Sequence, residues 1–229
     1  MHPKTTKKSL NEIHRPPLKK FSLILLVVLL LVGVAWLWRY QSNTSTVKSV
    51  GIQPFGSFPQ QHIDSVRSAI QKQYGFNVYV LPQKPLPQHC FVQLKSPRYR
   101  ADKLLKYLKN IRPDTIHYML GLTKKDISTT KRDKNGRVKK PKSKYEDWGI
   151  FGLGYRPGQA SIVSSFRLNK PGKTIERLQK VCVHELGHNL GLEHCTSKLN
   201  CVMDDAAETI RTVDAGHITL CVRCKEILQ

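Results

Sequence analysis

The segment with the clearest potential for chemistry begins at Val181 and reads VCVHELGHNLGLEHC. It places His184 and His188 four residues apart, and in a helix such side chains lie on one face, one turn apart. Both imidazoles can therefore bind a single metal ion. Glu185 can stand beside that ion as a general base without binding it. The pattern favours a metal-assisted hydrolase, although an ordinary amphipathic helix with two surface histidines shows the same five residues.

Two further residues extend this pattern and make it more specific. Gly191 allows the helix to end and the chain to turn back, which brings His194 in as a third nitrogen ligand. Three protein ligands with one open position are typical of a catalytic zinc rather than a structural one. Glu208 is an alternative third ligand, because nineteen residues separate it from His188 and this spacing suits a carboxylate on a second helix.

Four of the six cysteines fall in the last 35 residues, and two of them form a CxxC pair. This grouping predicts a structural zinc site with four thiolate ligands, which would fix the direction of the neighbouring His194. Two disulfides or simple burial are the alternatives. The four residues are Cys195, Cys201, Cys221 and Cys224. Cys90 and Cys182 stand apart, as core residues or as a disulfide pair.

The stretch from His184 to Cys224 resembles the signature of the archaemetzincin family of zinc peptidases. That signature is HExxHxxGxxHC, four residues, CxM, seventeen residues and CxxC. This chain has five residues between Cys195 and Cys201 and matches the signature otherwise. The resemblance is close over this stretch and looser back to Val47. Better-known members of the family are soluble proteins.

The resemblance implies two zinc ions per chain and a role for each residue of the signature. Glu185 would act as the general base, and Met203 would form the methionine turn beneath the metal, which is compatible with a core methionine. The substrate would be a peptide or protein, with aminopeptidase action as one expectation and an extended path along an edge strand near 160–167. The catalytic zinc would be bound by His184, His188 and His194, and the structural zinc by Cys195, Cys201, Cys221 and Cys224.

Alternating strand and helix patterns upstream predict an α+β (mixed α/β) domain that positions these residues. We expect a compact metzincin-like domain over 47–229, with one small twisted mixed sheet, an active-site helix and a C-terminal segment held by the four cysteines. Strands are expected at 47–55, 76–81, 91–94, 116–122, 148–153 and 160–168. Helices are expected at 60–73, at 101–110, and from about Thr174 to Gly191.

The N-terminal part of the chain predicts a membrane anchor. Residues 21–38, FSLILLVVLLLVGVAWLW, are almost wholly apolar, and eighteen residues of helix span ~27 Å, close to the hydrocarbon core of a bilayer. A basic tail, 1–20, precedes this segment, and a linker, 39–46, follows it. The positive-inside rule then predicts a single-pass protein with a cytoplasmic N-terminus and an extracytoplasmic catalytic domain. Secretion after cleavage of a signal peptide is the alternative.

The net charge of +22 is concentrated locally rather than spread over the whole domain. Residues 123–144 contain ten lysines and arginines against two aspartates, which is typical of a solvated loop. Contact of this segment with polyanions is a further expectation. Specific nucleic-acid binding is not predicted, because few aromatic residues interrupt the basic run. The alternative overall function is a membrane-anchored binding module with a non-catalytic zinc site.

Overall fold

The computed structural model describes residues 27–36, 47–197, 200–204 and 209–228. The chain divides into two compact units, Met1–Thr46 and Val47–Gln229, which are considered separately. The second unit contains all the residues for which chemistry is predicted.

The structure does not bear out the membrane anchor predicted over 21–38. The helix described in this region covers 27–36, and ten residues of helix extend only ~15 Å, about half of the ~30 Å hydrocarbon core. The remaining positions of the prediction lie outside the described residues. Among the residues that the structure describes, none of the helices combines the length and the apolar character needed to cross a bilayer. The membrane localisation predicted from this segment is corrected accordingly, and membrane contact is not carried further.

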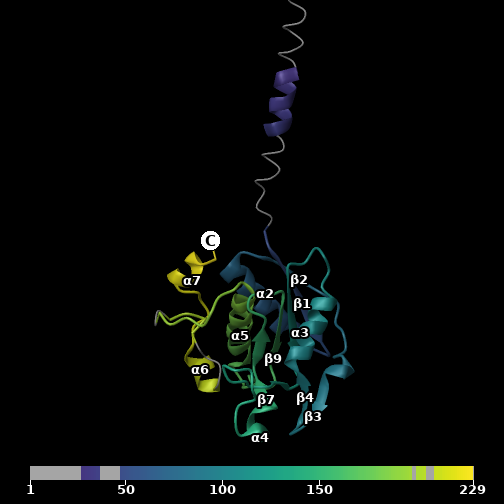
Figure 1. The fold of residues 1–229 in the computed structure, drawn as a ribbon, viewed down its shortest axis with the longest axis vertical. Coiled ribbons are helices and arrows are strands. Elements are labelled where there is room, and N and C mark those ends of the chain that lie inside the picture. Colours follow the sequence, from purple (N-terminus) through teal and green to yellow (C-terminus); the bar gives the residue numbers. More distant parts are fainter. Residues whose placement is uncertain (1–26, 37–46, 198–199, 205–208, 229) are drawn as a thin grey trace, which may run out of the picture. The chain divides into compact units, whose positions relative to one another are not determined.

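The core of the second unit is a five-stranded sheet with the order β2-β1-β5-β9-β8 (Figure 1). Strands β2, β1, β5 and β9 run parallel to one another, and β8 runs antiparallel to β9. This topology leaves β8 at one edge of the sheet, beside the active-site helix. The strands are β1 (Ser49–Phe55), β2 (Asn77–Val80), β5 (Tyr118–Thr123), β8 (Gly152–Gly154) and β9 (Ala160–Ser164).

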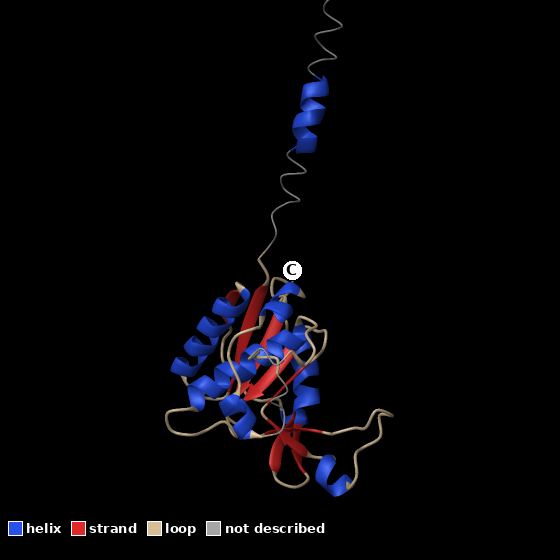
Figure 2. Ribbon diagram, turned by 90° about the vertical axis from the view of Figure 1, so that its left-hand side faces the viewer, coloured by secondary structure: helices blue, strands red, loops and turns tan. Residues whose placement is uncertain are grey.

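Helices cover both faces of this sheet (Figure 2). Helices α2 (Gln60–Tyr74) and α5 (Thr174–Asn189) pack on one face and bury Val66, Ile70, Leu178 and similar side chains against it. Helix α3 (Ala101–Asn110) packs on the other face, with Leu104, Leu105 and Leu108 inward. Each helix predicted at 60–73, 101–110 and from about Thr174 is present, because it exposes one polar face and buries one apolar face. Strands are present in each segment predicted as a strand, and β1, β5 and β9 are buried along almost their whole length.

A second, four-stranded sheet differs from the prediction of a single sheet. Its order is β3-β4-β6-β7, with β3 (Phe91–Gln93), β4 (Pro97–Arg100), β6 (Ile127–Thr129) and β7 (Trp148–Ile150). A one-turn helix, η1 (Gln88–Cys90), leads into β3. The run 148–153, predicted as one strand, is divided at Phe151: β7 pairs with β6, whereas β8 pairs with β9. The chain thus passes from the second sheet directly to the edge of the first.

Buried ion pairs connect the two sheets. Arg167, just after β9, makes two bonds of 2.7 and 2.8 Å to the carboxylate of Asp126. Arg98 of β4 donates to the same carboxylate at 2.8 Å and to Asp147 at 3.0 Å. Both aspartates are buried, and such paired charges are costly to separate. The network fixes β7, and therefore β8, relative to the main sheet.

The basic segment 123–144 is folded rather than an open loop. It contains strand β6, then a hairpin whose turn is closed by Asp133, and then most of helix α4 (Lys142–Tyr145). The N–H groups of Asn135 and Arg137 donate to the Asp133 carboxylate at 2.9 and 3.0 Å. The base of this hairpin is held by two further bonds, from the Lys131 N–H to the Tyr145 carbonyl at 2.9 Å and from the Lys139 N–H to the Lys131 carbonyl at 3.0 Å. Lys131 lines the active-site cavity described below.

The C-terminal segment packs on α2 and α5. It carries α6 (Ile210–Ala215) and α7 (Val222–Glu226), and its cysteines bury themselves against Val183 and Leu192. Arg177 of α5 makes a bidentate pair with Asp214 of α6, at 2.6 and 2.7 Å. This neighbouring guanidinium lowers the pKa of Asp214 to about 2. The pair holds α6 against the active-site helix.

Candidate active site and cysteine cluster

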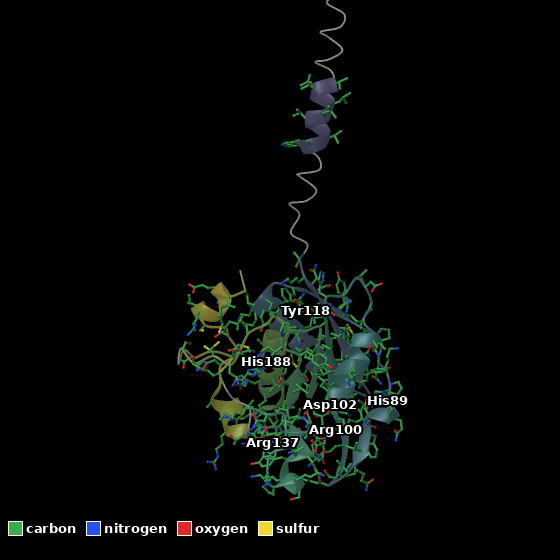
Figure 3. All side chains as sticks on the ribbon, in the orientation of Figure 1. His89, Arg100, Asp102, Tyr118, Arg137 and His188 are labelled. Carbon is green, nitrogen blue, oxygen red and sulfur yellow. The ribbon has the colours of Figure 1, made fainter. Side chains whose placement is uncertain are left out.

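The three histidines of the sequence pattern converge in the structure. His184 and His188 come from successive turns of α5, and their ring centroids lie 4.6 Å apart. The ring of His194 lies 5.4 Å from the first and 5.0 Å from the second. One nitrogen of each ring lies within 4.8 Å of the others, so a single ion fits between them. Figure 3 labels His188, which belongs to α5.

Backbone carbonyls orient two of these rings. Nδ1–H of His184 donates to the carbonyl of Val202, and Nδ1–H of His188 donates to that of Leu192, both at 2.8 Å. A ring that donates from Nδ1 keeps an unprotonated Nε2, which is the form that binds a metal. The donor set and its orientation therefore fit zinc, for which imidazole nitrogens are ordinary ligands.

Gly191 makes the turn that brings the third histidine into position. Its φ of +95° lies in the region that favours glycine. The turn is closed by N–H groups of Gly191 and Leu192, which donate to His188 and Gly187 carbonyls at 2.9 and 3.0 Å. The same turn presents the Leu192 carbonyl that orients His188. The turn at Gly191 thus positions His194 and also orients His188 through the Leu192 carbonyl.

Replacing Gly191 by alanine is expected to lower the free energy of unfolding by about 1–2 kcal/mol and to weaken zinc retention. The new Cβ would lie 4.0 Å from Pro157, so the cost comes from the backbone rather than from a collision. Gly172→Ala is the matched control, because its φ is +75° and its surroundings are open. Both variants should lose stability in a denaturant titration, but only Gly191→Ala should lose zinc during dialysis against a weak chelator. Equal zinc retention in the two variants would contradict this role.

Glu185 lies beside the glycines of β8 and lines the same cavity as the three histidines, with 9% of its surface exposed. A Cβ at Gly152 would lie 2.8 Å from its Oε1, so the glycines of β8 make room for this carboxylate. Burial raises the pKa of Glu185 to about 8, against the opposing effect of a hydrogen bond from the Gly154 backbone N–H. A carboxyl group in this setting can both accept and return a proton near neutral pH.

Met203 packs between α5 and the loop that carries His194. Its side chain is fully buried, and its sulfur fills the space beside Gly187, between the two ligand-bearing positions of α5. Its carbonyl accepts a 2.8 Å hydrogen bond from the N–H of Cys195, the residue after His194. Met203 therefore contacts the helix with its side chain and the third-histidine loop with its backbone.

The four C-terminal cysteines also converge, with all four sulfur atoms within 4.8 Å of one another. The sulfurs of Cys195 and Cys221 lie 3.7 Å apart, and none of the six cysteines forms a disulfide. Sulfurs that share a tetrahedral zinc at about 2.3 Å would lie about 3.8 Å apart, so the donor set fits zinc. The sulfur of Cys201 also accepts N–H groups from Met203 and Cys221, at 3.4 and 3.3 Å. Backbone donors of this kind favour a thiolate.

The extra residue between Cys195 and Cys201 is accommodated in the loop. Asn200 adopts a φ of +56°, a conformation that asparagine tolerates, and turns the chain into Cys201. The two remaining cysteines, Cys90 and Cys182, are buried in different core clusters. They are core residues rather than a disulfide pair.

A cavity of about 350 Å³ lies in front of the histidines and Glu185. Strand β8 forms one wall, and Val181 and Val213 contribute apolar surface. The substrate path predicted along 160–167 is wrong, because β9 is an interior strand with β5 and β8 on its two sides. The edge strand available to a substrate is therefore β8.

Comparison with known proteins identifies the family. Residues 45–229 match the model of Peptidase family M54. The chain belongs to this family. It is a zinc metallopeptidase, and hence a hydrolase.

Relatives of this M54 peptidase include the archaemetzincins of several organisms. That of Haloquadratum walsbyi is 30% identical over 190 residues, covering 78% of this chain and 98% of the relative. The crystal structure of the Methanopyrus kandleri archaemetzincin superposes with a TM-score of 0.66 at 27% identity, covering 81% of this chain and 96% of that one. The Archaeoglobus fulgidus archaemetzincin, complexed with malonate, gives a TM-score of 0.61 at 27% identity, covering 78% and 99%. The mixed α/β fold is therefore the archaemetzincin fold.

Several residues that line the M54 cavity had no signal in the sequence. Lys131 and Arg156 contribute charge, and Phe151 contributes apolar surface. Lys131 comes from the base of the basic hairpin, and Phe151 and Arg156 lie on either side of β8. The sequence pattern did not separate β8 from β7. Glu208, the alternative third ligand, lies outside the described residues, whereas His194 joins the other two histidines.

Proposed function

We propose that this M54 peptidase hydrolyses peptide bonds at the cavity, with His184, His188 and His194 holding the catalytic zinc. The observation that carries this proposal is the convergence of three imidazole nitrogens within 4.8 Å, beside an open cavity that also contains Glu185. Zinc bound there would lower the pKa of a water molecule and polarise the substrate carbonyl.

Glu185 is the proposed general base and acid. Its carboxylate lies in the same cavity as the histidines, where it can take the proton of the attacking water and deliver it to the leaving amine. Contact with Gly152 and a hydrogen bond from Gly154 hold the carboxylate in place. Gly152 thus leaves space for the Glu185 carboxylate, and Gly154 donates a hydrogen bond to it.

The substrate is proposed to lie extended along the free edge of β8. Phe151 and Tyr155 bond across to β9, at 2.8 and 3.2 Å. In an antiparallel pair, hydrogen bonding to one neighbour alternates along the strand, so the backbone groups of Gly152 and Gly154 face the other way. Because the Gly154 N–H already donates to Glu185, a peptide added at this edge would pair with the N–H and carbonyl of Gly152 and with the carbonyl of Gly154, next to the histidines.

The four-cysteine group is proposed to hold a second, structural zinc, giving two zinc ions per chain. Its support is the geometry of the four sulfurs, together with the bond between Cys195 N–H and Met203. This metal would hold the loop that carries His194 in place. The family membership makes the non-catalytic binding module unnecessary as an explanation.

Aminopeptidase action has less support from this cavity than cleavage of internal bonds. A substrate α-ammonium group needs a carboxylate partner, and Glu185 is the one carboxylate among the described residues of the lining. The two other charged side chains there, Lys131 and Arg156, are cationic and would repel an α-ammonium group. We therefore infer that the enzyme accepts peptides without a free N-terminus.

The experiment that tests this function compares one peptide in two forms, with a free and with an acetylated N-terminus. Both are expected to be cleaved, with kcat/KM of the acetylated form at least equal to that of the free form. A zinc chelator should abolish cleavage of both, and added zinc should restore it. Cleavage restricted to the free form would support aminopeptidase action instead. Cleavage that survives complete zinc removal would contradict the proposed mechanism.

A further inference from the structure

Strand β8 is a weak element for its role as the proposed substrate edge. It has three residues, Gly152–Gly154, and two of them are glycines, which lose more backbone freedom on folding than other residues and have no side chain to pack. Its only strand partner among the described residues is β9, so its outer edge is paired with no strand. Contacts outside the sheet must therefore hold this strand beside α5.

The start of β8 is held through the ion-pair network between the two sheets. Arg98 donates to the carbonyl and to the carboxylate of Asp147, at 2.9 and 3.0 Å, and Asp147 directly precedes β7. Phe151 is the one residue between β7 and β8. Gly154 then lies directly against α5, since a Cβ there would lie 2.7 Å from the carbonyl oxygen of Glu185. The turn that follows β8 is held by a different residue, at the end of α5.

That residue is Asn189, which bonds to the turn between β8 and β9. Its side-chain Nδ2 donates to the carbonyls of Tyr155 and Ala160, both at 2.9 Å. Its backbone carbonyl accepts the N–H of Gly158 at 3.1 Å. Asn189 is the last residue of α5, follows His188 directly and is 2% exposed. It thus joins both ends and the middle of the turn to the helix that carries the histidines.

We propose that Asn189 is a positioning residue for the substrate, because its three hydrogen bonds set the distance between the open edge of β8 and the histidines of α5. This inference rests on the proposed path of the peptide along β8. It adds a residue that is neither a metal ligand nor the general base. Asn189 is not part of the described lining of the active-site cavity, so it acts through β8 rather than by contact with the substrate.

An amide suits this position because one NH2 group supplies two donors. The two carbonyls that accept them come from opposite ends of the turn. The carbonyl of Ala160 also accepts the N–H of Tyr155 at 3.2 Å, so one oxygen joins Asn189 to the pairing of β8 with β9. Removal of the amide would take a donor from each of these carbonyls and release the end of β8 from α5.

Gln53 of β1 provides a matched control. Its side chain is fully buried, and its Nε2 donates to the carbonyls of Pro54 and Pro82, at 3.0 and 2.8 Å. Neither its Oε1 nor the Oδ1 of Asn189 has a hydrogen-bond partner among the described residues. Strands β5 and β9 separate β1 from β8. Gln53→Ala therefore removes the same kind of interaction at a distance from the proposed substrate path.

The test uses the full chain and two blocked peptides with the same scissile bond. The short peptide has one residue on each side of that bond, and the long one has four, which extend about 13 Å each way. Asn189→Ala is expected to lower kcat/KM for the long peptide by about 10- to 100-fold, mainly through KM, since displacement of a binding edge weakens binding. The short peptide has few main-chain groups to pair with β8, so its kcat/KM should be nearly unchanged.

Two further variants show whether the hydrogen bonds of the amide are responsible. Asn189→Ser retains one donor and should give a smaller loss for the long peptide than Asn189→Ala. Gln53→Ala should change the ratio of kcat/KM between the two peptides in neither direction. Zinc content should be the same in all these proteins, because the metal ligands are untouched.

Binding of the long peptide is measured in parallel by fluorescence anisotropy in the Glu185→Gln protein, with and without Asn189→Ala. Weaker binding in the double variant supports the inference even if no peptide is cleaved, whereas an absence of cleavage contradicts the proposed function. Equal binding of the long peptide overturns the inference, whatever the hydrolysis result. If Asn189→Ala does not fold, Asn189→Ser replaces it in this assay, with the same two outcomes.

Three other results would also overturn the inference. The first is an equal loss of kcat/KM for the short and the long peptide in Asn189→Ala. The second is loss of zinc from that variant, since Asn189 would then act on its neighbour His188 rather than on β8. The third is an effect of Gln53→Ala on the long peptide as large as that of Asn189→Ala, since any loss of a buried amide would then suffice.

Discussion

Replacing Glu185 by glutamine is expected to lower kcat by about 10²–10⁴-fold, the usual contribution of a positioned general base. Glutamine has the same shape, so it fits the space beside Gly152 and can still accept the N–H of Gly154. It cannot take a proton from water. The fold and the metal sites should therefore persist while proton transfer is lost.

Three measurements on the Glu185→Gln protein distinguish this outcome from misfolding. Zinc content by mass spectrometry and the unfolding temperature should match the unsubstituted protein, and KM should change little compared with kcat. Glu193→Gln, an exposed glutamate nearby on the same segment, is the control and should retain the same order of activity. A Glu185→Gln enzyme with full activity would show that another group moves the proton.

Replacing Cys201 by alanine is expected to remove one of two zinc equivalents and to lower the unfolding temperature by roughly 8–16 °C. Structural zinc sites contribute several kcal/mol to folding, and a loss of about 4 kcal/mol corresponds to roughly 2–4 °C per kcal/mol in a domain of this size. Activity should fall as well, because Cys195 of the same group directly follows His194. The loss of the structural metal would release the third catalytic ligand.

Cys90→Ala is the matched control for this variant, because both cysteines are almost fully buried and only Cys201 belongs to the sulfur cluster. The control should lose stability from packing alone and keep its zinc. Thiol titration of the unsubstituted protein after denaturation with chelator should give all six cysteines. A titration that finds only two thiols would instead indicate disulfides among the last four cysteines. Equal zinc content in the Cys201→Ala and Cys90→Ala proteins would contradict the structural zinc.

The sequence predicted most of the individual helices and strands but not their separation into two sheets. Helices α2 and α3 follow from their apolar periodicity almost to the residue. Strands β4 and β6 were missed, because three or four residues carry too little periodicity, and β6 lies within a run of lysines. The apolar composition of 21–38 predicts a membrane span, whereas the helix that the structure describes there covers 27–36.

The sequence alone determined which side chains can meet at the zinc helix. The positions of His184 and His188 in successive turns, and the glycine that ends the helix, are local features, so their consequences follow from backbone geometry. Only the tertiary structure decided what faces them. It placed the edge strand β8 against Glu185, and it brought Lys131 and Arg156 to the cavity from segments distant in the chain. These placements depend on strand pairing and buried ion pairs between remote residues, which leave no local pattern in the sequence.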